Sequence, residues 1–309
     1  MTGAVGFSAD GIIDTHVHVV SEDAARYPRQ INASAIRRWW DGVACDTAAL
    51  LRAMDAHGVA AALAVQAVGV YGYDNTYVLD EVAPGSRRVA AVAAVDVDAE
   101  GAAEEITRLS AVAGVAGVRL FAVSPGSSWV HTGKADEAFD AASRSGLPVV
   151  LTVFEQQLPP LAPSLARYPT LPIVLDHCAF PTRDGARIDR GSPLLELVTV
   201  PNVTVKVSSH VLLEVASPGA PSELIDDLLS EFGADRVMWG SDWPQTPLPD
   251  YGAHLQLAQR ATGHLERNVR LRVMGRNAAE WLGGRFVNSV GGALDPVAPG
   301  TGENHDADR

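Results

Sequence analysis

Residues 11–18 read Gly-Ile-Ile-Asp-Thr-His-Val-His, and this stretch decides the fold class. Its apolar first half is typical of a buried strand, and it ends in two histidines. An open, doubly wound sheet normally has a glycine-rich phosphate loop after its first strand, and none follows here. The stretch therefore favours the first strand of a closed barrel, in which polar residues gather at the strand ends.

Seven further apolar runs follow, and segments with helix signals separate them. This alternation predicts an α/β protein with a (β/α)8 TIM barrel fold. The predicted strands cover residues 11–18, 59–66, 88–96, 115–122, 147–154, 171–178, 203–208 and 235–242. The predicted helices cover residues 48–58, 74–83, 99–114, 135–145, 158–167, about 192–199, 223–233 and about 265–282.

Capping residues mark several of these helices. Thr47 and Asp98 are predicted to lead into the first and third helices, and Gly58 is predicted to end the first. Pro221 and Ser222 are predicted to open the helix at 223–233. Each helix would return the chain to a new parallel strand, as a barrel requires.

Residues 1–287 are predicted to form a single catalytic domain, because α/β barrels routinely exceed 250 residues around one core. A lid-like insertion at about 19–46 separates the first strand from its helix, and its length places it over the catalytic face. Residues 288–309 are rich in Gly, Asp, Pro and Asn, which predicts a disordered tail.

The composition excludes several classes of partner. The net charge is −13, and 24 Lys and Arg residues are spread along the chain, which disfavours nucleic acid and anionic membranes. No apolar run approaches the roughly 20 residues of a membrane span, and no signal peptide is expected, so we expect a cytoplasmic protein that acts on a small molecule. A homo-oligomer is left open. Cys45 and Cys178 have no metal-binding spacing and are predicted to be buried or half-buried thiols.

Polar residues end three of the predicted strands. His16 and His18 share one side of the first strand because side chains alternate along it. His177 ends the sixth run, and Asp242 ends the eighth in Gly-Ser-Asp-Trp-Pro. Taken alone, the histidines are equally consistent with core residues whose hydrogen bonds are satisfied within the protein. Taken alone, Asp242 is consistent with an acidic residue in a turn or at a helix cap. Together they predict a catalytic site, since only a barrel brings these strand ends to one mouth.

These motifs resemble the amidohydrolase superfamily, specifically its amidohydrolase-2 branch, which includes sugar-lactone hydrolases and 2-pyrone-4,6-dicarboxylate hydrolase. The resemblance runs from Ile13 to about Leu282. It rests on DTHVH at 14–18, DN at 74–75, GVRLF at 117–121, PIVLDH at 172–177, NVTVKVS at 202–208, RVMWGSDWPQ at 236–245 and NAAEWL at 277–282.

The resemblance also implies what metal the site could hold. The superfamily's dinuclear site needs a histidine at the end of the fifth strand and a carboxylated Lys or a Glu from a middle strand. Here the fifth strand ends at Glu155 and the fourth offers Arg119, so that site is incomplete. A single Zn on His16, His18 and Asp242, with Glu155 or His177 completing a tetrahedral set, is one alternative. The other, which we favour from the sequence, is a site that needs no metal or holds one weakly.

The reaction predicted for this site is lactone hydrolysis. Asp242 would act as general base on water, and His16, His18 and His177 would polarise the carbonyl of a ring-containing, relatively apolar substrate. The runner-up is a metal-dependent nonoxidative decarboxylase of an aromatic or unsaturated acid. A noncatalytic binding protein on a barrel scaffold is the third reading.

Seven further residues are predicted to contact substrate because they lie at strand ends or in loops of the catalytic face. Arg119 would bind a carboxylate, with a structural ion pair as its alternative, and Lys206 would bind an anion or be a buried paired amine. Glu155 would shuttle a proton or pair with Lys206. The others are Trp40, Tyr73, Trp243 and His210. Three histidines are instead predicted at the surface: His57, His254 and His264.

Overall fold

The computed structural model describes residues 10–30, 39–82, 88–123, 127–216 and 220–283. The predicted tail at 288–309 and residues 31–38 of the predicted insertion lie outside these ranges.

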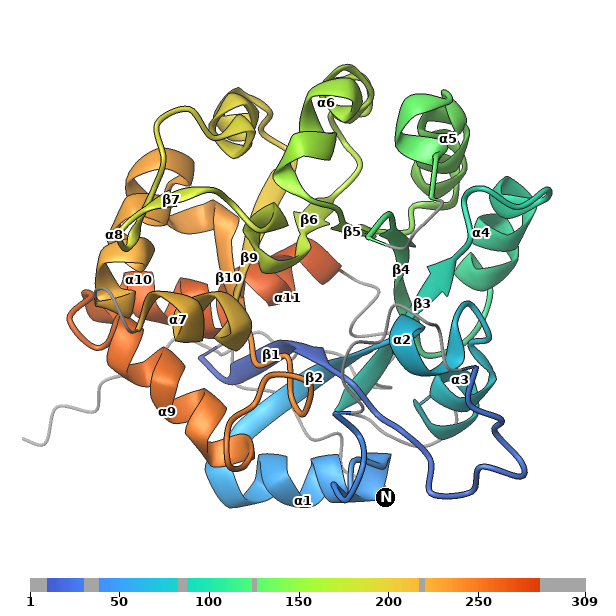
Figure 1. Cartoon of the computed structure of the whole chain (residues 1–309), viewed down its shortest axis with the longest axis horizontal. Coiled ribbons are helices and arrows are strands. Elements are labelled where there is room, and N and C mark those ends of the chain that lie inside the picture. The colour runs from blue at the N-terminus through green and yellow to red at the C-terminus, as the bar shows by residue number, and fades with distance from the viewer. Residues whose placement is uncertain (1–9, 31–38, 83–87, 124–126, 217–219, 284–309) are drawn as a thin grey trace, which may run out of the picture.

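Eight parallel strands form one sheet that curves into a ring, with helices around its outside (Figure 1). Their spatial order follows the chain, as in repeated βα units. Each predicted run contains one strand, so the predicted barrel is confirmed. The strands are β1 (Ile12–Val17), β2 (Val59–Val65), β3 (Val89–Val95), β4 (Val115–Phe121), β5 (Val149–Thr152), β6 (Ile173–Leu175), β9 (Val203–Ser208) and β10 (Val237–Gly240).

The ring closes between β1 and the segment that follows β10. The backbone N–H of Asp242 donates to the His16 carbonyl at 2.7 Å, and the N–H of His18 donates to the Trp243 carbonyl at 2.8 Å. Val17 and Trp243 form an isolated parallel bridge between these hydrogen bonds. The seam of the barrel is therefore made by the same residues that the sequence predicts as catalytic.

Helices cover the outside of the ring. The helices that overlap predicted helical segments are α1 (Thr47–His57), α3 (Thr76–Val82), α4 (Ala102–Ser110), α5 (Lys134–Ser145), α6 (Leu158–Arg167), α8 (Pro221–Phe232), α10 (Arg267–Leu271) and α11 (Asn277–Leu282). Unpredicted helices are α2 (Val68–Tyr71), α7 (Ser209–Val215) and α9 (Tyr251–Thr262), and β7 (Arg183–Asp184) and β8 (Arg187–Ile188) form a small antiparallel pair.

The predicted helix ends are partly right. Gly58 ends α1 in the left-handed conformation, with φ of 66°, and Pro221 opens α8, both as predicted. The cap of α1 is Asp46 rather than Thr47, because the Asp46 carboxylate accepts a hydrogen bond from the Ala49 N–H at 2.6 Å. Asp98 caps no helix. Its carboxylate binds Ser128, and α4 begins four residues later.

Two other predicted helices have a different form. Residues 193–199 form a 3₁₀ helix, and a π-helical turn at 272–276 joins α10 to α11. The longest of the three unpredicted helices is α9, which follows β10. Its buried face combines Tyr251, Leu255 and Ala258 with Gly252 and His254, and the last two weaken the apolar stripe.

Part of the interior of the ring is apolar. Alternate strand positions such as Leu63, Val92, Val150 and Val174 form one buried cluster, to which α11 contributes Trp281. Figure 1 shows α11 within the outline of the ring. Further along the strands the inward positions become polar, and this change of character locates the site.

Two remaining predictions concern thiols and membranes. Cys45 and Cys178 are both buried free thiols, as predicted. Within the described part of the chain, no helix has the length and apolar character that crossing a membrane requires.

Candidate active site

His16 on β1 and His18 directly after it are buried and lie against each other. Their Nε2 atoms are 3.3 Å apart. The other ring nitrogen of His18 is 2.8 Å from the carbonyl oxygen of Val65 on β2, and that of His16 is 3.1 Å from Oδ1 of Asp176, directly after β6. Each ring is thus oriented by a partner on a different strand, as metal-binding or catalytic histidines commonly are.

Asp242 completes this cluster from the opposite side of the seam. It is buried, and its φ of 57° lies in the left-handed region, which is uncommon for a residue with a Cβ. Its Oδ1 is 3.6 Å from Nε2 of His16 and 3.4 Å from Nε2 of His18. Its Oδ2 accepts a hydrogen bond from the Thr246 hydroxyl at 2.7 Å. Among the described residues, Oδ1 has no hydrogen-bond donor.

The partners of the two rings determine where their hydrogens lie. The Val65 carbonyl can only accept, so Nδ1 carries a hydrogen in His18. Nδ1 of His16 is nearer to the Asp176 carboxylate, at 3.1 Å, than to the Lys206 ammonium, at 3.5 Å, which favours a hydrogen on Nδ1 there too. Burial lowers the pKa of His16 well below its usual value, which keeps that ring neutral. Nε2 of His16 is then a bare lone pair, and it faces the acceptor Oδ1 of Asp242 at 3.6 Å. Two acceptors at this separation repel one another unless a cation lies between them.

The same three atoms have the spacing of a metal site. Nε2 of His16, Nε2 of His18 and Oδ1 of Asp242 lie 3.3 to 3.6 Å from one another. Ligand atoms of a tetrahedral zinc site, with bonds of about 2.0–2.1 Å, are about 3.3–3.4 Å apart. Two imidazoles and one carboxylate are also ligands that zinc accepts. The donor set therefore fits a single divalent metal ion.

Gly240 lets the two sides of the seam approach this closely. A Cβ at Gly240 would lie 2.7 Å from the Cβ of His16 and 2.9 Å from its backbone nitrogen. Those distances are below any normal contact, so a larger residue would displace His16.

A buried ion-pair network centred on Asp176 contacts the cluster through the ring of His16. The Lys206 ammonium donates to Oδ1 of Asp176 at 2.7 Å, and Nη2 of Arg119 lies 3.3 Å from Oδ2. The Thr152 hydroxyl also donates to Oδ2, at 2.7 Å. Burial raises the pKa of Asp176, but Lys206 and His16 outweigh it and hold that pKa well below its usual value. Asp176 is thus an ionised acceptor for the ring of His16.

Arg119 and Lys206 therefore have protein partners. The Arg119 guanidinium also donates to Oγ1 of Thr152 at 2.9 Å and to the Gln66 carbonyl at 3.0 Å, with only 4% of the residue exposed. Two roles were predicted for Arg119: binding a substrate carboxylate, or forming a structural ion pair. These contacts show the structural ion pair. Lys206 is the buried, paired amine of the sequence analysis, but its partner is Asp176 and not Glu155.

His177 is held next to the cluster by an unusual backbone. Four successive residues, His177 to Phe180, have φ between 53° and 58° although none is glycine. Nδ1 of His177 lies 2.7 Å from the Ser208 hydroxyl, and its ring centre is 5.0 Å from that of His16. Burial lowers the pKa of His177 to about 4, so the ring is neutral at pH 7.

Aromatic rings flank the cluster. The Trp39 ring centre is 5.5 Å from that of His18, and the Phe180 ring centre is 4.9 Å from that of His177. Trp40, which the sequence singled out, is buried and supports Trp39 edge-on at 5.3 Å. His210 is partly exposed, with its ring centre 5.8 Å from that of His177.

The remaining predicted contact residues bind other parts of the protein. The Trp243 ring is buried against Tyr251, while its backbone helps to close the seam. The Tyr73 hydroxyl lies 3.4 Å from the Phe121 carbonyl, and burial raises the pKa of Tyr73 to about 12. Glu155 is buried and accepts hydrogen bonds from the hydroxyls of Thr182 and Ser192, so the structure does not bring its carboxylate to the cluster.

The sequence analysis missed several residues of this site. Asp176 precedes His177 at a strand end, and that position was the available signal for it. Asp14 carried the same signal, since its carboxylate binds the backbone N–H groups of His16 and Ser241. The surface assignment holds for His57 and His264, but it is wrong for His254, which is fully buried on α9.

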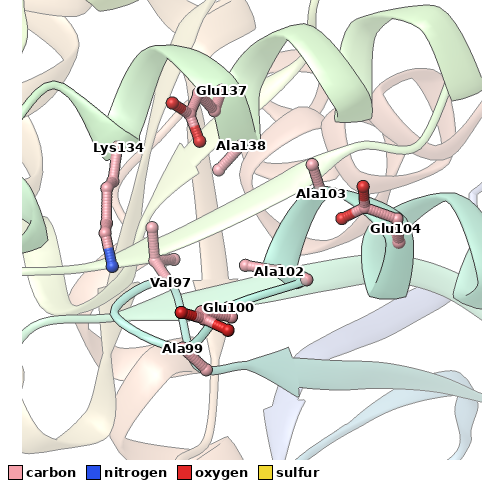
Figure 2. Close-up of a pocket in the computed structure, with 10 residues that line it drawn as sticks. Val97, Ala99, Glu100, Ala102, Ala103, Glu104, Lys134, Glu137 and Ala138 are labelled. Atoms are coloured by element: carbon pink, nitrogen blue, oxygen red, sulfur yellow. The ribbon is translucent and has the colours of Figure 1, made fainter.

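A separate cavity of about 340 Å³ lies between the loop after β3 and the start of α5 (Figure 2). Its lining includes Glu100, Glu104, Glu137 and Lys134, and it shares no residue with the histidine cluster. The chemistry described above is therefore distinct from this cavity.

Comparison with known proteins agrees with this site and fold. The amidohydrolase family model matches residues 13–284, and the chain belongs to this family. Two curated relatives are L-fucono-1,5-lactonases. The one from Burkholderia ambifaria is 31% identical over 219 residues, covering 67% of this chain and 75% of the relative. The one from Burkholderia multivorans is 29% identical over 303 residues, covering 86% and 94%.

Solved structures of related proteins agree with this family assignment. An amidohydrolase from Burkholderia multivorans with bound zinc is 25% identical, with a TM-score of 0.68, and the match covers 88% of this chain and 99% of that one. A putative 2-pyrone-4,6-dicarboxylic acid hydrolase from Pseudomonas putida is 26% identical, with a TM-score of 0.67 and coverage of 88% and 97%. The chain is thus an amidohydrolase-family hydrolase of the type that acts on ester bonds, with lactonases among its relatives.

Proposed function

We propose that this protein is a lactonase that uses one zinc ion, held by His16, His18 and Asp242. The observation that carries the proposal is the set of three facing ligand atoms 3.3 to 3.6 Å apart, with no hydrogen-bond partner for Oδ1 of Asp242 among the described residues. The lactonase names of two relatives and the zinc in one related structure support it. This favours the metallated alternative over the metal-independent one.

When bound, zinc supplies Lewis acidity, which polarises the lactone carbonyl and makes water easier to deprotonate. Asp242 alone would be a weak base. Burial raises its pKa, but the adjacent rings of His18, His177 and His16 outweigh burial and hold the pKa below its usual value. General bases work best when their pKa is near the operating pH. The carboxylate is nevertheless ionised at neutral pH and ready to accept a proton.

The protein's own groups then account for the movement of atoms. The oxygen of water adds to the carbonyl carbon of the lactone, and Oδ1 of Asp242 accepts the proton that water loses. The ring C–O bond breaks, and Asp242 returns that proton to the departing ring oxygen. The product is a hydroxy acid. Thr246 holds Oδ2 throughout, which keeps Oδ1 directed at the reacting water.

His177 is positioned to stabilise the negative charge that develops on the carbonyl oxygen. The Ser208 hydroxyl lies 2.7 Å from Nδ1 and accepts from the Val211 N–H, so its own hydrogen is free to point at Nδ1. In that arrangement Nε2 of His177 carries the ring hydrogen. A neutral N–H donor at this position would form a stronger hydrogen bond to the oxyanion than to the carbonyl of the substrate.

The substrate is a ring-containing, relatively apolar lactone. Trp39 beside His18 and Phe180 beside His177 place aromatic faces on two sides of the cluster, which suits a ring. Arg119 and Lys206, the strand residues from which a carboxylate contact was expected, are paired with Asp176. The partly exposed His210 is the residue of the predicted set best placed to touch the substrate's periphery.

A substrate panel tests the proposal. Zinc-loaded protein is incubated with aldonolactones, an aryl lactone and 2-pyrone-4,6-dicarboxylate, and acid release is followed with a pH indicator. A hydroxybenzoate is tested in parallel for loss of CO₂. We expect acid release from at least one lactone and no decarboxylation. Decarboxylation without hydrolysis of any lactone would replace this proposal with the runner-up reaction.

A further inference from the structure

The conformation of Asp242 is fixed by the peptide unit that precedes it. This unit contains the Ser241 carbonyl and the Asp242 N–H, and rotating it changes φ of Asp242 directly. The N–H donates to the His16 carbonyl at 2.7 Å. The Ser241 carbonyl accepts a hydrogen bond from Nδ1 of His254 at 2.9 Å. Both ends of the peptide unit are therefore held, one by β1 and the other by α9.

Holding this unit matters because φ of Asp242 is 57°. Asp adopts a left-handed backbone more readily than most residues with a Cβ, but the conformation is still uncommon, so surrounding contacts help to maintain it. In that conformation Oδ1 of Asp242 lies 3.4 Å from Nε2 of His18 and 3.6 Å from Nε2 of His16. Relaxing the backbone to an ordinary φ would swing the carboxylate away from both rings.

The surroundings of His254 indicate that its side chain serves to make one hydrogen bond. It is fully buried, and because a carbonyl only accepts, Nδ1 must carry the ring hydrogen. Nε2 is then a bare acceptor, and it has no hydrogen-bond partner among the described residues. A buried unsatisfied acceptor is destabilising. The donor at Nδ1 therefore has a role that outweighs this cost.

The same face of α9 supports the other side of the seam. Tyr251 lies three residues before His254, one turn away on the helix. Its hydroxyl donates to Oδ2 of Asp14 at 3.0 Å, and Oδ1 of Asp14 accepts from the Ser241 N–H at 2.8 Å. Ser241 is thus bound to α9 directly through its carbonyl and indirectly through its N–H.

We propose that His254 is a positioning residue for Asp242, acting through the Ser241 carbonyl. The inference rests on the proposed function only in giving Asp242 its role as zinc ligand and base. The hydrogen bond from α9 maintains the left-handed backbone, and the backbone directs Oδ1 at His16 and His18. Any side chain that supplies a donor at the place of Nδ1 should preserve this arrangement.

Two substitutions separate the hydrogen bond from the volume of the ring. His254→Asn places an amide N–H near the position of Nδ1, whereas His254→Leu fills the space without a donor. His264→Asn is the matched control, since His264 lies beyond α9 and pairs with Asp226 on α8. Zinc affinity is measured by competition with a chromophoric chelator, and kcat and KM are measured on the lactone found above.

We expect His254→Leu to weaken zinc binding at least 10-fold and to lower kcat more than it changes KM. The zinc affinity and kcat of His254→Asn and His264→Asn should stay within about threefold of those of the unsubstituted protein. Equal losses in the Asn and Leu variants, or no loss in either, would overturn the proposal. His254→Met replaces the Leu variant if the latter does not fold.

A crystal structure of the His254→Leu protein keeps this inference distinct from the proposed function. If the unsubstituted protein neither binds zinc nor hydrolyses lactones, the proposed function fails and the positioning role is judged from the structure alone. We expect φ of Asp242 to leave the left-handed region in the variant. An unchanged φ and an unchanged place for Oδ1 would contradict the positioning role.

Discussion

Replacing Lys206 by methionine removes one of the two cations that bind Asp176. The chain has only two lysines, and the ammonium of this one is buried 2.7 Å from Oδ1 of Asp176. Breaking a buried ion pair typically costs about 3–5 kcal/mol, because the remaining charge is left without a partner. In Lys206→Met, however, Arg119 still balances Asp176. We therefore expect a loss of about 3 kcal/mol, at the lower end of that range.

Asp176→Asn should be more damaging than Lys206→Met. It leaves Lys206 and Arg119 as two buried cations with no anion between them, and it weakens the acceptor that orients His16. We expect a loss of about 5 kcal/mol, at the upper end of the same range. In the double variant the unpaired ammonium is absent, so the combined loss should be smaller than the sum by about 1–3 kcal/mol.

Urea unfolding of metal-free protein measures these differences. Tryptophan fluorescence and circular dichroism should give coincident transitions, which justifies two-state free energies. Lys134→Met is the control, because Lys134 is the other lysine and is only partly buried. A Lys206→Met loss equal to or larger than that of Asp176→Asn would refute this description of the network. So would single-variant losses that add to within about 0.5 kcal/mol.

Three further predictions concern the seam, the base and the thiols. Gly240→Ala should displace His16 and lower zinc affinity by at least 10-fold, measured by chelator competition; unchanged affinity would contradict the close approach of β10 to β1. Asp242→Asn should lower kcat by about 10²–10⁴ while the melting temperature stays near that of the unsubstituted protein; unchanged turnover would remove Asp242 as the base. Burial raises the pKa of Cys45 to about 11 and that of Cys178 further. Both thiols should therefore react with a disulfide reagent at pH 8 only after unfolding, with the rate for Cys45 rising toward pH 11; fast labelling of native protein would contradict their burial.

Much of the fold could be predicted from the sequence, because its signals are local. Eight apolar runs alternate with helix signals, polar residues mark three of their ends, and alternation along the first run was enough to place His16 and His18 on one side. The helix α9 carries a weaker signal. Tyr251, Leu255 and Ala258 have helical spacing, but Gly252 and His254 interrupt the apolar character of the buried face. The same reason explains why His254 was predicted at the surface.

The pairing of charges could not be predicted from local signals. Arg119 lies on β4, Lys206 on β9 and Asp176 directly after β6, and only the register across the sheet from β4 to β9 brings them into contact. The backbone at His177 to Phe180 was equally hidden, since left-handed residues are normally signalled by glycine and this segment contains none. The residues that support the cluster thus depend on long-range geometry.

The measurement that tests the central claim most directly is metal content together with activity. The protein is stripped with a chelator, its zinc is counted by elemental analysis, and lactonase activity is assayed before and after one equivalent of zinc is restored. We predict one zinc per chain, activity lost on stripping and regained with zinc, and no tight zinc in His16→Ala or His18→Ala. Full lactonase activity in protein shown to be free of metal would contradict the account.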